Sequence, residues 1–122
     1  MKDMSLVVEA LGQEQATRMV CTLAIGLLTS LRCESITVDE VEWILFNPRT
    51  ARIMQLKGLS PELCSLIMEG CELEDAQSLW PDRLEANVQE LIARFTAILQ
   101  SNPVYAQRAN EKRKWEELYD VR

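Results

Sequence analysis

Apolar residues recur along this chain at the three- and four-residue spacing of a helix, and no segment shows the sustained alternation of a half-buried strand. Two long stripes predict a helix from about Gln13 to Arg32 and another from Pro81 to Gln100. The first stripe consists of Met19, Val20, Leu23, Ala24, Leu27, Leu28 and Leu31. The second consists of Leu84, Val88, Leu91, Ile92, Phe95, Ile98 and Leu99. We expect these two helices to pack against each other.

Several shorter helices are predicted between the two long ones, because the chain repeats the residue types that begin and end helices. A hydroxyl or amide side chain before the first turn caps free backbone amides, and proline suits the first helical position. Gly58 and Gly70 should end two of these helices. The starting signals are Thr37 with Glu40, Asn47-Pro48 and Ser60-Pro61.

The predicted fold class is therefore all-α: a compact multi-helix bundle with two long core helices and several short proline-capped helices. Residues 1–101 should form the helical core domain. Residues 102–122 should form a charged C-terminal helix, either part of that domain or an extension that binds a partner. Gly26 lies inside the first long helix, which suggests that a neighbouring helix crosses closely there. Trp43 and Phe46 are expected in the core or at helix contacts.

Charge narrows the class of partner. The 122 residues include 19 acids and 13 bases, a net charge of −6, and residues 34–90 hold 12 of the acids with only four bases. Such a field attracts cationic molecules and repels phosphate backbones, so a nucleic-acid partner is disfavoured. The longest apolar run is too short to span a bilayer, and the amino terminus has no secretory pattern. We therefore expect a cytoplasmic protein without a membrane partner.

The residue types that usually carry catalysis are scarce. Histidine is absent, and the four cysteines show no C-x-x-C spacing, so no Cys/His metal site can be built. The thiols are expected to be reduced and mostly buried. There is no glycine-rich phosphate loop. We expect no catalytic residue, no bound metal and no cofactor.

The segment around Gly70 is the richest in acidic side chains, and it has three interpretations. The acids can simply favour the positive end of a helix dipole. They can form a docking surface for lysine and arginine, with Trp80 as a desolvated anchor. They can also hold a divalent metal, as in all-α nucleotide pyrophosphohydrolases, although Gly70 interrupts the first carboxylate pair. The candidate partner-binding residues are Glu69, Glu72, Glu74, Asp75, Trp80, Asp82 and Glu85.

Two segments resemble those of a family of small, all-helical bacterial proteins of largely unassigned function. They are residues 36–48, ITVDEVEWILFNP, and residues 70–81, GCELEDAQSLWP. The chain is also similar in size and charge to immunity proteins of contact-dependent growth inhibition systems. This resemblance covers about residues 15–100. It implies a cytoplasmic antidote that binds a toxin domain, often a basic nuclease, and blocks its active site or its target surface.

The expected function is thus that of an immunity protein that neutralises a cognate toxin domain by stoichiometric binding. A small metal-dependent nucleotide hydrolase is the first alternative. A regulatory adaptor or homodimer is the second, and it would use the C-terminal helix, where Trp115 and Tyr119 lie four residues apart on one face.

Overall fold

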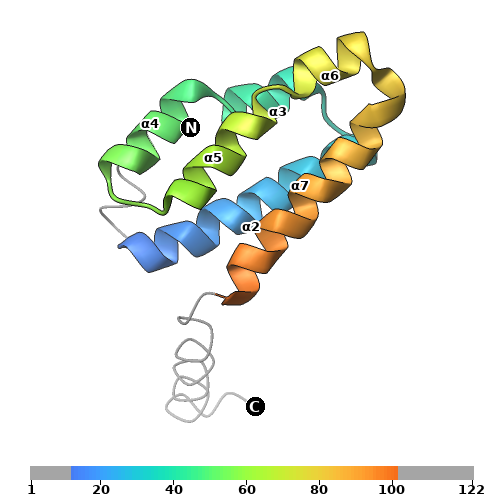
Figure 1. Ribbon diagram of the computed structural model, residues 1–122. Helices are drawn as coiled ribbons and strands as arrows, with labels where there is room; N and C mark the ends of the chain where they lie inside the picture. The colour runs from blue at the N-terminus through green and yellow to red at the C-terminus, as the bar shows by residue number, and fades with distance from the viewer. Residues whose placement is uncertain (1–11, 102–122) are drawn as a thin grey trace, which may run out of the picture.

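The computed structural model describes residues 12–101, and these residues form six helices and no strand (Figure 1). The helices are α2 (Gln13–Arg32), α3 (Val38–Ile44), α4 (Pro48–Leu56), α5 (Pro61–Gly70), α6 (Leu73–Leu79) and α7 (Pro81–Ser101). The prediction of an all-α fold is confirmed. The predicted C-terminal helix, with Trp115 and Tyr119, lies outside the described residues.

The two long helices pack against each other as their stripes predict, with α2 and α7 crossing in Figure 1. Val20, Ala24 and Leu28 of α2 are buried in the same core cluster as Val88 and Phe95 of α7. The start of α2 is joined to the end of α7 by a hydrogen bond, in which Arg18 Nη1 donates to the backbone oxygen of Leu99 at 3.1 Å. None of the described helices combines the length and the apolar character that crossing a membrane requires.

The short helices begin where the capping signals place them. Each capping side chain accepts a hydrogen bond from the backbone N–H three residues later, which satisfies an amide that the helix leaves free. The pairs are Thr37 with Glu40 at 3.2 Å, Asn47 with Thr50 at 2.9 Å and Ser60 with Leu63 at 3.2 Å. Gly58 follows α4 with φ of 82°, a conformation that suits glycine. These local predictions are confirmed.

Gly70 ends α5 as predicted, and it also has a packing role that its position in the sequence does not reveal. It is the last residue of α5, is buried and does not adopt a positive φ. A Cβ atom at this position would overlap the ring of Phe46, which packs edge-to-face on Phe95 with ring centroids 5.9 Å apart. The expectation that a neighbouring helix crosses closely at Gly26 is wrong. Gly26 is exposed, and a Cβ there would meet no atom within 4 Å.

Trp43 also departs from expectation, because 76% of its surface is exposed. The helix α3 is only seven residues long and turns Val38 and Val41 inward. The core position expected for Trp43 is filled instead by the residues that follow the helix, Leu45 and Phe46, which are almost completely buried.

All four cysteines are free, as expected, but their burial differs. Cys21 is buried, and this burial raises the pKa of its thiol to about 11, so the group stays protonated at neutral pH and packs as a small apolar side chain. Cys64 and Cys71 are partly buried. Cys33 is exposed, so the expectation of burial is wrong for this thiol.

Candidate binding cleft

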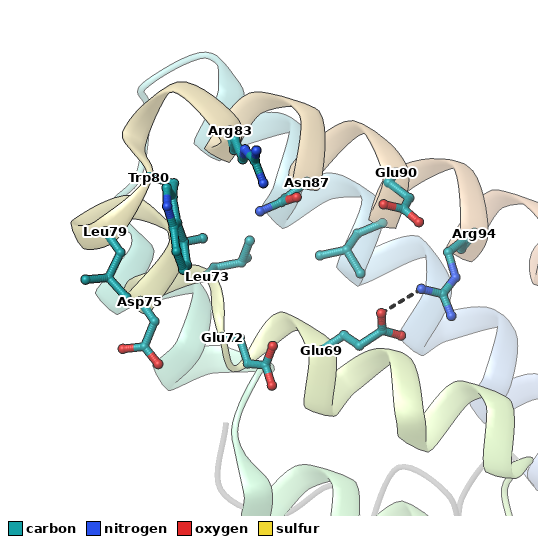
Figure 2. Close-up of a pocket in the computed structure, with 12 residues that line it drawn as sticks. Glu69, Glu72, Leu73, Asp75, Leu79, Trp80, Arg83, Asn87, Glu90 and Arg94 are labelled. Atoms are coloured by element: carbon teal, nitrogen blue, oxygen red, sulfur yellow. Dashed lines mark hydrogen bonds and ion pairs between the residues drawn. The ribbon is translucent and has the colours of Figure 1, made fainter.

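A cleft of about 500 Å³ separates the corner formed by α5 and α6 from the part of α7 that ends at Arg94 (Figure 2). Leu73 and Leu91, both buried, contribute apolar surface to it. One wall carries Glu69, Glu72, Asp75, Leu79 and Trp80. The other wall carries Arg83, Asn87, Glu90 and Arg94, all from α7.

The acidic wall is shaped by the way three helices follow one another with almost no connecting chain. Cys71 closes α5 through a hydrogen bond from its N–H to Ile67, and α6 begins two residues later. Trp80 lies between α6 and α7, where the following proline disfavours helical geometry. The backbone oxygen of Trp80 accepts a hydrogen bond from the N–H of Arg83 at 2.9 Å. This bond fixes the corner, and 57% of the Trp80 surface remains exposed.

One ion pair crosses the cleft. The guanidinium of Arg94 donates to Glu69 Oε1 at 2.8 Å, and both side chains are partly exposed (Figure 2). The hydrogen bond to Glu69 raises the pKa of Arg94 above its ordinary value. Glu72 and Asp75 lie on the same wall as Glu69. Within residues 12–101 neither of them forms an ion pair or a side-chain hydrogen bond.

The acidic residues expected to form one patch do not lie together, because only three of them line the cleft, so the prediction of a single surface is wrong. Glu69, Glu72 and Asp75 share the cleft with Trp80. Glu85 faces a second hollow, near the end of α2, where it pairs with Arg32 at 3.7 Å. Asp82 is exposed and lines neither hollow. Glu74 turns toward α3 instead.

On that side Glu74 joins Asp39 and Glu42, and carboxylate oxygens of the three residues lie within 4.8 Å of one another. The backbone N–H of Glu74 donates to Glu42 Oε1 at 3.2 Å. Burial raises the pKa of Glu42, and the neighbouring charge of Glu74 adds to the effect. Among the described residues, this is the one group of three carboxylates whose oxygens are close enough to share a cation. The spacing of Glu69, Glu72 and Asp75 does not produce one.

We expect Glu42→Gln to stabilise the protein at neutral pH. A carboxyl whose pKa is raised in the folded state contributes stability below its unfolded value of 4.5, and that contribution is lost as pH rises through the folded pKa. Glutamine removes the repulsion and keeps an oxygen for the Glu74 N–H. Solvent screening limits the gain to a few tenths of a kcal/mol.

Thermal unfolding at neutral pH and near pH 4 would measure this effect. The midpoint should rise at neutral pH only. Glu40→Gln, which removes an exposed acid of α3 outside the trio, should not raise the midpoint at either value, because a first-turn acid favours the helix dipole. A rise in midpoint from Glu42→Gln that is larger near pH 4 than at neutral pH would contradict the raised pKa of Glu42.

Four polar residues of the cleft were absent from the sequence-based site: Arg83, Asn87, Glu90 and Arg94. They recur at helical spacing along one face of α7. This polar stripe was a signal in the sequence that could have identified them. The contact of Arg94 with Glu69 joins residues 25 positions apart, and local patterns do not specify such a contact.

The chain matches one family model, over residues 11–117, and that family is described as a protein of unknown function (DUF3969). The chain belongs to the DUF3969 family. The expected membership of a small family of unassigned function is thereby confirmed, whereas the comparisons give no support to a likeness to immunity proteins. No curated protein and no solved structure matches this DUF3969 chain. Its function therefore has to be inferred from its own cleft and charges.

Proposed function

We propose that this DUF3969 protein acts by stoichiometric binding of a protein partner in the cleft between α6 and α7. The observation that carries the proposal is the exposure of Trp80 and Leu79, 57% and 63%, at the edge of a hollow. Large apolar side chains grouped at a concave surface are typical of interaction sites, and tryptophan is enriched among the residues that dominate binding energy.

The charge of the cleft supports a cationic partner. Its lining includes four carboxylates and two guanidinium groups, which leaves a net charge of −2 within a chain of net charge −6. An anionic hollow draws positively charged proteins toward it and repels acidic ones. The partner that fits best is a basic protein domain.

The specific role that we propose is immunity: the chain binds a basic toxin domain, often a nuclease, in the cytoplasm and covers its active site or target surface. The size, the acidic charge and the segment 70–81, which contributes to the acidic wall, support this role. The two alternatives have weaker support, since the carboxylate trio of Asp39, Glu42 and Glu74 lies outside the cleft. Glu69 is engaged by Arg94, which weakens the hydrolase hypothesis, and the adaptor or homodimer hypothesis depends on residues beyond 101.

The proposal is tested by titrating the protein against a basic toxin domain encoded by an adjacent gene. Binding without turnover predicts that toxin activity falls linearly and reaches zero at one equivalent. Co-expression should restore the growth of cells that produce the toxin. Failure to inhibit at any ratio would refute immunity, and inhibition by a small fraction of an equivalent would indicate catalysis.

The unpaired acids of the cleft should set the association rate. Replacing Glu72 with Gln together with Asp75 with Asn removes two charges beside the binding surface. Association should slow about tenfold at low salt, and the effect should shrink near 0.5 M salt, where the Debye length is about 4 Å. Stopped-flow fluorescence would measure the association rate at both salt concentrations.

The control for this experiment removes the same net charge elsewhere. Glu40 and Glu62 are exposed and do not line the cleft, so the double variant Glu40→Gln, Glu62→Gln should slow association much less. Equal slowing by the two double variants would show that net charge acts without a local steering surface.

A further inference from the structure

The chemistry of the acidic wall defines one side chain of the partner. We propose that the cleft accepts an arginine of the bound protein, with its guanidinium between the carboxylates of Glu72 and Asp75 and against the ring of Trp80. This inference rests on the proposed function and names the group that the cleft recognises.

The cleft already contains one contact of this kind. Arg94 reaches from α7 to the acidic wall and places its guanidinium 2.8 Å from Glu69 (Figure 2). The wall is therefore accessible to an arginine that approaches across the cleft. Glu72 and Asp75 continue the same wall, and no basic side chain of residues 12–101 pairs with them. Among the residues that the structure describes, these two acids thus have no basic partner that would compete with an entering guanidinium.

Trp80 makes arginine a better occupant than lysine. Trp80, Asp75 and Glu72 lie on the same wall of the cleft (Figure 2). A planar guanidinium stacks on an aromatic face while its N–H groups bind carboxylates, and it is more weakly hydrated than an ammonium. The exposed Leu79 offers apolar surface to the methylene groups of the same side chain.

The opposite wall is compatible with this occupant. Arg94 is neutralised by Glu69, so the cleft charges that have no ion pair within residues 12–101 are those of Glu72, Asp75, Glu90 and Arg83. Their sum is −2, and one entering guanidinium reduces it to −1. Arg83 projects from α7, across the cleft from the acidic wall (Figure 2). An acidic group of the partner can meet it there without competing for the arginine position.

The test uses three capped tripeptides, Gly-X-Gly, in which X is arginine, lysine or the neutral isostere citrulline. Each is titrated into the full chain while the indole N–H signals of Trp80 and Trp43 are followed by NMR. The arginine peptide should shift the Trp80 signal saturably. The lysine peptide should bind at least about threefold more weakly, because it lacks the planar fork, and citrulline should give no saturable shift.

Two double variants complete the design. Glu72→Gln with Asp75→Asn should weaken arginine binding by roughly tenfold, and Glu40→Gln with Glu62→Gln should leave it unchanged. Glu72 makes no side-chain capping bond to α6, so its replacement does not remove a structural contact. Trp43 lies on α3 and does not line the cleft, so its signal reports any unspecific binding to exposed tryptophan.

Equal affinity for arginine and citrulline, or unchanged affinity after loss of Glu72 and Asp75, would overturn the arginine assignment. Neither result touches the titration against the toxin domain, which tests the proposed function on its own. Conversely, a partner that binds away from Trp80 would refute the proposed site even if the arginine peptide binds.

Discussion

Replacing Gly70 with alanine is expected to destabilise the protein by about 2–3 kcal/mol, because the new methyl group has no space. A Cβ at this position overlaps the ring of Phe46, which is itself enclosed and packed against Phe95. The ring cannot turn away without disturbing the contact between two core aromatics. The backbone of Gly70 has no positive φ, so the loss reports overlap and not backbone strain.

Urea unfolding followed by circular dichroism would measure this loss, and Gly26→Ala is its control. Gly26 is exposed in the interior of α2, with open space where the methyl group would go. Alanine there should stabilise the protein by up to about 1 kcal/mol through helix propensity alone. If Gly70→Ala were as harmless as Gly26→Ala, the packing of α5 on Phe46 described above would be wrong.

Replacing Trp80 with alanine is expected to weaken binding of the toxin domain by at least about thirtyfold, equivalent to roughly 2 kcal/mol. The change removes the largest exposed apolar side chain of the cleft, and most of the loss should appear in the dissociation rate. Stability should change little, because 57% of the Trp80 surface is exposed before the partner binds. Isothermal titration calorimetry would measure the affinity, and surface plasmon resonance would measure the dissociation rate.

Trp43→Ala is the matched control, since this tryptophan is even more exposed, at 76%, and lies outside the cleft. The variant should bind the toxin domain with unchanged affinity. If Trp43→Ala caused the larger loss, the partner would dock on α3, and the cleft would not be the binding surface.

The helices themselves could be predicted from the sequence because their determinants are local. Stripes of apolar residues and capping side chains such as Thr37 and Ser60 act within one or two turns, and the structure contains the hydrogen bonds that they imply. The two glycines show where local reasoning stops. Gly26 is exposed, whereas Gly70 is buried against Phe46, and only the tertiary arrangement brings Phe46 onto Gly70.

The candidate site was predicted in part, for the same reason. Sequence proximity placed Glu72, Glu74 and Asp75 in one patch, but consecutive positions on a helix point in different directions, so Glu74 meets Glu42 on the far side. The basic wall of α7 required knowledge of which helices are neighbours. The orientation of Trp43 required knowledge of which side of a seven-residue helix faces the core.

Amide hydrogen exchange of the chain, free and bound to the toxin domain, tests the location of the binding site most directly. If the partner occupies the cleft, exchange should slow in α6 and in the part of α7 that ends at Arg94, with little change in α4. Protection confined to α3 and α4, with α6 and α7 exchanging as in the free protein, would contradict binding in the cleft.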